Sequence, residues 1–173
     1  MRLEAAVVVL LFASTFSAFA QLSRSQEDAA KKIAATVCAS CHTVDGNSLQ
    51  PAVPKLAGLQ SQYLLKQLKD YIAGKRKNGT ATPCGPELNP DDVAGLADYF
   101  NGQKPAPGKI GDSALAAEGS KVYDQGNSAS GVDDCQQCHN PDGKGSGRYP
   151  RVAGQHARLR HRSDDCLKDA QAA

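Results

Sequence analysis

Cys38-Ala39-Ser40-Cys41-His42 and Cys135-Gln136-Gln137-Cys138-His139 are two copies of the pattern Cys-x-x-Cys-His, and they stand 97 residues apart. The chain has 173 residues, among them six Cys and four His. A random chain of this composition would contain roughly 0.005 copies of the pattern. Two copies therefore indicate two sites with the same chemistry.

This spacing is typical of a site where a c-type haem is attached covalently. Two thiols one helical turn apart can reach the two vinyl groups of one porphyrin, and the histidine that follows can turn its imidazole onto the iron. A structural zinc site is disfavoured because about 90 residues would separate the two Cys pairs, whereas zinc ribbons close short loops. A thioredoxin-like dithiol is disfavoured because no β-rich run flanks either motif.

Residues 1–20 have the pattern of a secretory signal peptide. Met1-Arg2 precede an apolar run at 5–12, and Ala18-Phe19-Ala20 forms an A-x-A cleavage site. The run is shorter than the about 20 apolar residues that a membrane anchor needs, although an uncleaved anchor stays an alternative. Export to the periplasm agrees with the motifs, because bacteria attach haem covalently outside the cytoplasmic membrane. The net charge of +2 gives no indication of nucleic-acid binding.

The chain repeats itself at the spacing of the motifs. His42 and His139 are each followed four residues later by a glycine, and the stretch 54–58 (PKLAG) matches 150–154 (PRVAG). The repeat indicates duplication of a single-haem domain. We therefore expect an all-α fold with a first domain at 21–104, a linker at 105–112 and a second domain at 113–173.

The first unit contains three segments with helical patterns. Ser25 with Asp28 three residues later predicts a helix start, with a helix over 28–37 leading into the motif. An apolar face on 61–73, ended by Gly74, predicts a second helix that closes over the haem edge. Asn89 as cap and Pro90 at the first position predict a terminal helix that packs on the first one. The terminal helix should bury Val93, Leu96, Ala97 and Phe100, and 113–123 should restart a helix before the second motif.

The order of these elements resembles a class I cytochrome c, and the doubled arrangement resembles the dihaem cytochrome c4 family. The resemblance covers about residues 26–159 and includes 63–68 (YLLKQL), 94–100 (AGLADYF) and 154–157 (GQHA). It implies two haem c groups, with thioethers at Cys38, Cys41, Cys135 and Cys138 and with His42 and His139 as the proximal iron ligands.

The resemblance also gives a role to two prolines. Pro54 lies 12 residues after His42, and Pro150 lies 11 residues after His139. In class I cytochromes a proline at this place offers its carbonyl to the histidine Nδ1, which fixes the ring and strengthens it as a ligand. A plain turn proline is the alternative.

The distal ligands that the resemblance implies are missing from the sequence. The family's sixth iron ligand is a methionine thioether, which raises the reduction potential, but the only methionine is Met1. Ala81 stands where the first unit should carry the methionine. Cys84 is a candidate thiolate ligand, with an ordinary half-buried cysteine or an open iron as alternatives. For the second iron, His156 and His161 are alternatives, although the family carries the former without using it on the iron.

The second unit resembles the family only in its first part. Beyond Leu159 the sequence becomes polar, includes Cys166 without an assignable partner, and stops at Ala173. The first unit runs 37 residues from Tyr63 to Phe100, whereas 14 residues follow Leu159. We therefore expect the second domain to be incomplete, and a frame change near codon 158 or a degenerate gene copy is the hypothesis for its cause.

These features predict a periplasmic carrier of single electrons rather than an enzyme. By the resemblance, its partners are redox proteins such as a quinol-oxidising complex and a terminal oxidase, with peripheral membrane association as a further option. Two alternatives stay open: a haem protein with open iron that binds a small ligand or peroxide, and a degenerate remnant that folds poorly. Lysines form a predicted docking patch for an acidic partner, with a solvated face as its alternative; they are Lys55, Lys66, Lys69, Lys75 and Lys77.

Overall fold

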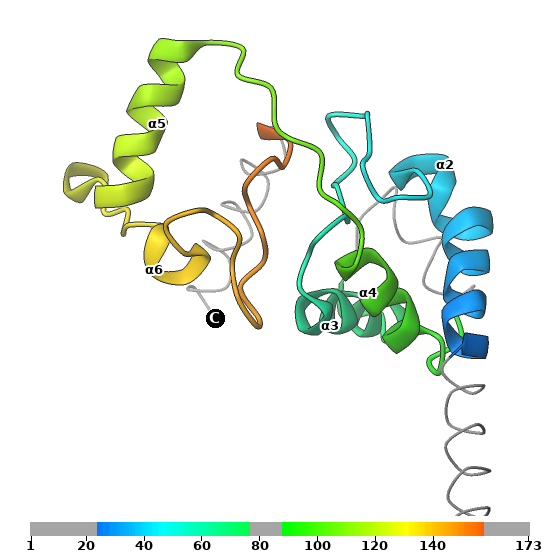
Figure 1. Ribbon diagram of the computed structural model, residues 1–173. Coiled ribbons are helices and arrows are strands. Elements are labelled where there is room, and N and C mark those ends of the chain that lie inside the picture. Colours follow the sequence, from blue (N-terminus) through cyan, green and yellow to red (C-terminus); the bar gives the residue numbers. More distant parts are fainter. Residues whose placement is uncertain (1–23, 77–87, 158–173) are drawn as a thin grey trace, which may run out of the picture.

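The computed structural model describes residues 24–76 and 88–157, and within these ranges the ordered elements are helices (Figure 1). The first unit contains a helix at 24–33, continued by a π-helical stretch η1 (Ala34–Cys38) and by α2 (Ala39–His42), then α3 (Ser61–Ile72) and α4 (Val93–Asn101). The second unit contains α5 (Ser113–Gln125), a short 3₁₀ turn η3 (Ser128–Ser130) and α6 (Gln136–His139). The predicted all-α class is confirmed.

The core of the first unit is built on the apolar face of α4. Val93, Leu96, Ala97 and Phe100 are each at most 2% exposed, as the sequence pattern predicts. They form one cluster with Ala34 and Cys38 from the first helix and with Leu59, Leu64 and Leu88, while Leu65, Leu68 and Ile72 of α3 pack against its edge. This cluster fixes the helix that ends in the first Cys-x-x-Cys-His motif.

Gly95 allows α4 to lie close to the first helix. A Cβ on Gly95 would stand 3.6 Å from Ala30 Cβ and 3.5 Å from the Gln26 carbonyl oxygen, which is already van der Waals contact. The predicted packing of the terminal helix on the first helix is therefore confirmed, and it brings together segments that are about 65 residues apart in the chain.

Two predicted helix starts are wrong in detail. Ser25 lies inside a helix that is already present at residue 24, so it is not the cap. Asn89 accepts a hydrogen bond from the Asp91 N–H at 3.1 Å, but it does so in a turn that precedes α4, whose first helical residue is Val93. Asn and Asp side chains favour such turns as readily as helix caps, and the sequence pattern does not separate the two.

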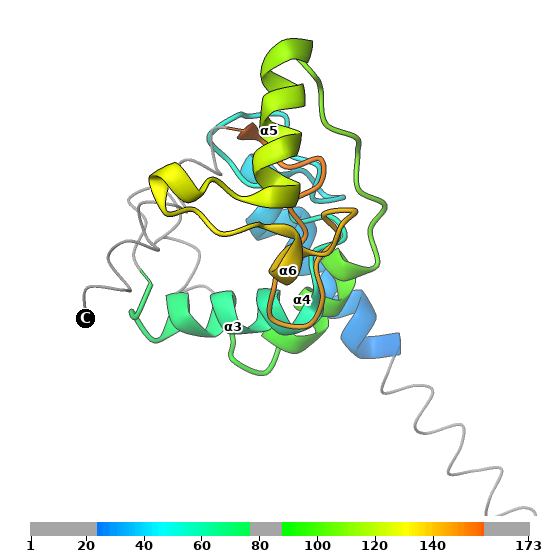
Figure 2. The ribbon, with the colours of Figure 1, turned by 90° about the vertical axis from the view of Figure 1, so that its left-hand side faces the viewer.

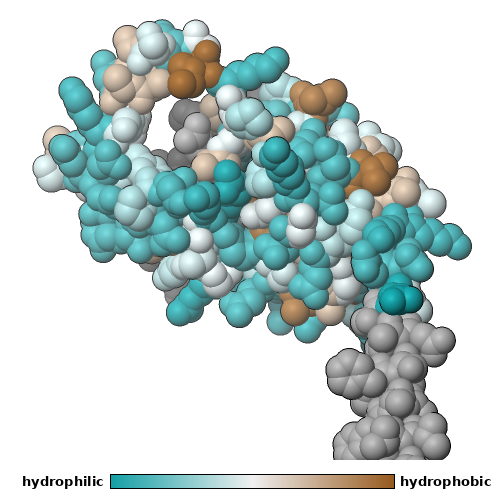
Figure 3. Space-filling view, viewed as in Figure 1, coloured by the Kyte–Doolittle hydropathy of each residue, from teal (hydrophilic) through white to brown (hydrophobic). Residues whose placement is uncertain are grey.

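The second unit begins with a capped helix that is mostly surrounded by solvent. Asp112 Oδ1 accepts hydrogen bonds from the Ala114 and Leu115 N–H groups at 2.9 and 3.0 Å, and α5 runs two residues past the predicted 113–123. No residue of α5 is buried, and Leu115 is 66% exposed. Figures 1 and 2 both show α5 standing well away from α3 and α4, and Figure 3 shows an open hollow beside it.

Several sequence predictions lie outside the described residues. They are the signal peptide at 1–20, Ala81, Cys84, Lys77, His161 and Cys166. Within the ranges that the structure describes, none of the helices combines the length and the apolar character needed to cross a bilayer.

Candidate haem sites

The histidine of the first motif is held by one strong hydrogen bond. His42 is the last residue of α2, and its Nδ1 donates to the Pro54 carbonyl oxygen at 2.8 Å. Burial lowers the pKa of His42, and the bond to the Pro54 carbonyl offsets part of that change. The ring is therefore neutral near pH 7 with its proton on Nδ1, and this leaves a lone pair on Nε2, the form that ligates a metal.

The histidine of the second motif is held in the same way. His139 ends α6, and its Nδ1 donates to the Pro150 carbonyl oxygen at 2.8 Å. The predicted role of both prolines as partners of the histidine Nδ1 is confirmed. Two motifs that lie far apart in the sequence thus present their histidines with matching local geometry.

The turn that follows each histidine is repeated as well. Thr43 and Asn140 both have a φ of 64°, an uncommon conformation for residues other than glycine. In the first unit, the Gly46 carbonyl accepts hydrogen bonds from the N–H groups of residues 56 and 57 at 2.7 and 3.2 Å; in the second, Gly143 accepts from residues 152 and 153 at 2.8 and 2.9 Å. These bonds fold the chain back so that each proline carbonyl meets its histidine.

The four motif cysteines differ in their exposure. Cys38 is 9% exposed and belongs to the first core, whereas Cys135 is half-buried; Cys41 and Cys138, the second thiol of each pair, are exposed. In each motif the first cysteine is therefore less exposed than the second. In the described part of the chain, no three His, Cys, Asp or Glu side chains come together as a metal-ion site.

His156 has a structural role. Its Nε2 donates to the Ser48 carbonyl oxygen at 2.9 Å, while the fully buried Ser48 hydroxyl donates to the Cys41 carbonyl at 3.1 Å. This bond uses one of the two ring nitrogens of His156 as a donor to a backbone carbonyl. His156 therefore ties the second unit to the back of the first motif.

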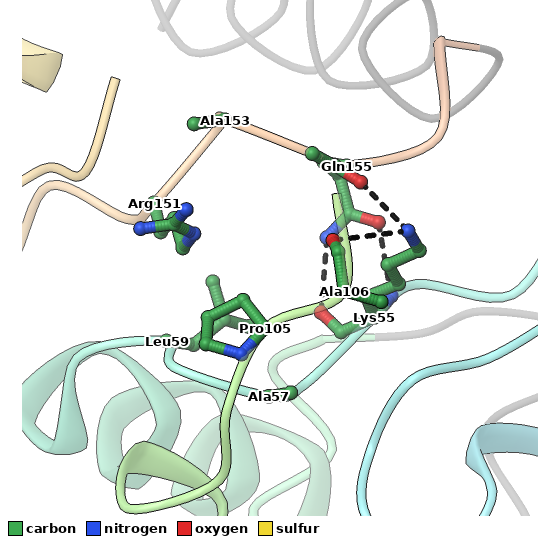
Figure 4. A pocket seen from close by; sticks show the side chains of 9 residues that line it. Lys55, Ala57, Leu59, Pro105, Ala106, Arg151, Ala153 and Gln155 are labelled. Carbon is green, nitrogen blue, oxygen red and sulfur yellow. Dashed lines mark hydrogen bonds between the residues drawn. The ribbon is translucent and has the colours of Figure 1, made fainter. Parts of the chain in front are cut away.

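The two units meet along a polar seam that contains Lys55, which Figure 4 shows pointing toward Gln155 and Ala106. The Lys55 Nζ donates to the Gly154 carbonyl at 2.9 Å and to the Ala106 and Pro107 carbonyls at 3.5 and 3.4 Å. The prediction that Lys55 belongs to a docking patch is wrong. Its ammonium group is used inside the protein, which a single-sequence count of exposed lysines does not reveal.

The residues present fit covalent haem. Each motif offers two thiols on one helical turn and a histidine whose Nδ1 is bonded to a carbonyl, which leaves Nε2 for the iron, the donor set that c-type haem requires. At the seam, the Nε of Arg151 is buried and has no hydrogen-bond partner among the described residues, and a cation in that position suits an acidic group such as a propionate.

Sequence reasoning missed three residues that support the site: Ser48, Gln60 and Gln155. All three make hydrogen bonds between the units or behind a motif. The one available signal was that two of them, Gln60 and Gln155, lie within a few residues of the repeated Pro-Lys-Leu-Ala-Gly and Pro-Arg-Val-Ala-Gly stretches.

Comparison with known proteins gives the family. The cytochrome c family model matches residues 27–104 and 116–172, and its second match extends past Leu159, where we expected the resemblance to end. Cytochrome c4 of Azotobacter vinelandii is 42% identical over 134 residues, which cover 71% of this chain and 63% of that protein. This chain thus spans less than two thirds of the length of that relative.

The matches to two other proteins span a larger share of the matched protein. Cytochrome c4 of Stutzerimonas stutzeri is 37% identical over 168 residues, covering 87% of this chain and 76% of the relative. The crystal structure of reduced recombinant cytochrome c4 from Pseudomonas stutzeri matches with a TM-score of 0.75 and 36% identity, over 83% of this chain and 80% of that one. The chain therefore belongs to the cytochrome c family and, within it, to the cytochromes c4, which carry covalently bound haem c, typically two groups.

Proposed function

We propose that this protein is a periplasmic dihaem carrier that passes single electrons between respiratory redox proteins. The observation that carries the proposal is the pair of matching histidines, each with Nδ1 held at 2.8 Å from a proline carbonyl. A covalently bound haem supplies a one-electron Fe(III)/Fe(II) couple. In this proposal the thioethers form at Cys38, Cys41, Cys135 and Cys138, and the axial histidines are His42 and His139.

The chain's own contribution is to hold the ligands still. The packed cluster under Cys38 and the folded-back turns keep each histidine in one orientation, so little rearrangement accompanies a change of charge at the site. A fixed ligand set of this kind suits electron transfer.

Partner docking is proposed on the solvent face of α3 and its end. Lys66, Lys69 and Lys75 are exposed there, and Lys66 pairs with Asp70 of the same helix. A surface of this charge attracts an acidic partner over several ångströms and loses that attraction as salt rises. By the family resemblance such partners are a quinol-oxidising complex and a terminal oxidase.

An anaerobic redox titration of the exported holoprotein tests the proposal. We expect two reversible one-electron couples in the visible spectrum and electron exchange with an acidic redox protein that slows as ionic strength rises. Replacing Lys69 and Lys75 by Glu should slow exchange at low salt without moving the potentials. Irreversible reduction would refute the carrier function, and exchange indifferent to both salt and charge reversal would refute docking on this face.

A second candidate function is binding of a small molecule at open iron. The observation that favours it is the sequence, whose only methionine is Met1. Carbon monoxide added to the reduced protein, and cyanide added to the oxidised protein, separate the two functions. A changed Soret spectrum at stoichiometric ligand supports open coordination, and an unchanged spectrum eliminates it.

A further inference from the structure

The peptide group that fixes the first histidine is hydrogen-bonded on both of its sides. The Pro54 carbonyl accepts from His42 Nδ1 at 2.8 Å, and the N–H of the same peptide, on Lys55, donates to Gln155 Oε1 at 2.9 Å. Gln155 belongs to the second unit. Its Nε2 also donates to the Lys55 carbonyl at 2.9 Å, so the amide is fixed by two bonds to one residue.

The second unit has a corresponding pair of hydrogen bonds at its own proximal peptide. The Pro150 carbonyl accepts from His139 Nδ1 at 2.8 Å, and the N–H of that peptide, on Arg151, donates to Gln60 Oε1 at 2.9 Å. Gln60 belongs to the first unit, and its Nε2 donates to the Lys144 carbonyl. Each unit thus contributes one glutamine to the proximal peptide of the other unit.

The reciprocity is more specific than a general interface contact. Lys55 and Arg151 occupy matching places in the repeated stretches 54–58 and 150–154, directly after the two prolines. The two glutamines do not match each other in the repeat, because Gln155 aligns with Leu59. Two glutamines at non-equivalent positions of the repeat therefore accept hydrogen bonds from the N–H groups of equivalent peptides. This indicates that the peptide itself is the target of the contact.

A peptide bond transmits the effect of one hydrogen bond to the other. When its N–H donates to an amide oxygen, electron density shifts toward the carbonyl oxygen, and the carbonyl becomes a stronger acceptor, by perhaps 10–30% per bond. A stronger acceptor on Nδ1–H gives the imidazole more negative charge. A more basic imidazole stabilises ferric over ferrous iron and lowers the reduction potential.

We propose that Gln155 and Gln60 are positioning residues that act crosswise: Gln155 lowers the reduction potential at the His42 site, and Gln60 lowers it at the His139 site. The inference rests on the proposed function, because it needs haem at both motifs. In the structure, two relays cross the seam, and each connects a glutamine of one unit to the proximal histidine of the other through one peptide group.

Isosteric substitution in the holoprotein tests the proposal. Gln155→Met removes the acceptor while filling the same space, and Gln60→Met does so on the other side. Potentials are read separately by NMR-monitored redox titration of protein with ¹⁵N-labelled histidine, and amide shifts of Lys55 and Arg151 report the lost bonds. We expect Gln155→Met to raise the potential at the His42 site more than at the His139 site, and Gln60→Met to do the reverse.

Two further variants sharpen the result. Gln155→Glu loses the Nε2 bond to the Lys55 carbonyl but gives the Lys55 N–H a carboxylate oxygen, which is a stronger acceptor than an amide oxygen, so it should lower the potential at the His42 site, opposite in sign to Gln155→Met. Gln103→Met is the matched control: this half-buried amide donates to the Tyr99 carbonyl at 3.0 Å and contacts neither proximal peptide, so neither potential should move. If the Met variants fail to fold, the reduction potential of Gln155→Glu at the His42 site still tests the relay.

The outcomes distinguish failure of the glutamine relay from failure of the proposed function. Crosswise shifts with opposite signs for Met and Glu support the relay. Equal shifts at both sites, shifts confined to the mutated unit, or no shift overturn it while leaving electron transfer intact. A holoprotein without reversible couples overturns the proposed function instead.

Discussion

Gly46 occupies a tightly packed position behind the first motif, and its replacement by Ala tests how the site is held. Gly46 has a φ of +74°, and a Cβ there would lie 2.8 Å from the Ala57 backbone nitrogen and 2.9 Å from Phe100 Cδ1. The left-handed conformation costs an L residue about 1–2 kcal/mol. Overpacking against a backbone atom and a buried ring adds about 1–3 kcal/mol. We expect Gly46→Ala to lower the free energy of unfolding by about 2–5 kcal/mol.

Gly74→Ala is the matched control within the same unit. Gly74 has a φ of +67°, but nothing lies within 4 Å of a Cβ placed on it. Only the conformational cost of about 1–2 kcal/mol applies to this variant. Urea unfolding of the holoprotein, followed by far-UV circular dichroism, measures both variants.

Gly46→Ala should also affect the hydrogen bond that holds the His42 ring. The Gly46 carbonyl anchors the N–H groups of residues 56 and 57, so displacing it moves Pro54 away from His42 Nδ1. The NMR signal of the His42 Nδ1 proton should exchange faster with solvent in Gly46→Ala than in Gly74→Ala. If the two variants lose equal stability and keep equal exchange, the close packing described behind the first motif is wrong.

Three further predictions concern the core, the seam and the first turn. Phe100→Ala removes a side chain that is 2% exposed, and it should cost about 3–5 kcal/mol in urea unfolding, with Phe100→Leu costing clearly less. Lys55→Met should make the segment 105–112 more sensitive to limited proteolysis, because the bonds from the Lys55 ammonium to the Ala106 and Pro107 carbonyls are lost; unchanged cleavage would refute a role for Lys55 at the seam. Hydrogen bonds from Thr43 and Asn47 hold the pKa of Asp45 below its usual 3.8, so its contribution to stability is complete above about pH 4 and is lost as pH falls through the lowered value. The stability gap between wild type and Asp45→Leu should therefore narrow on acidification, and a gap independent of pH would contradict the assignment.

The sequence predicted those parts of the structure that depend on local patterns. The buried stripe of α4 follows from helical spacing alone, whereas the hydrogen bonds of Pro54 and Pro150 to their histidines were expected from the resemblance to class I cytochromes c. The sequence did not predict the contacts between the two units. Glutamines are common on surfaces, so nothing local marks Gln60 or Gln155 as the partner of a peptide that lies 91 or 100 residues away in the chain.

The role of Lys55 was missed for a related reason. An ammonium group can bind carbonyl oxygens as well as an acidic partner, and only the fold decides which of these it meets. The η1 segment was also unforeseen, because a π-helical turn differs from an α-helix by one residue and leaves the apolar spacing nearly unchanged.

The number of covalent haems per chain tests the central claim most directly. A pyridine haemochrome assay combined with intact mass should give two haems for the exported protein. Replacing Cys38 and Cys41 by Ser should leave one haem, and replacing Cys135 and Cys138 by Ser should also leave one. A chain without covalent haem, or a haem count that either double substitution leaves unchanged, would contradict the assignment of these motifs.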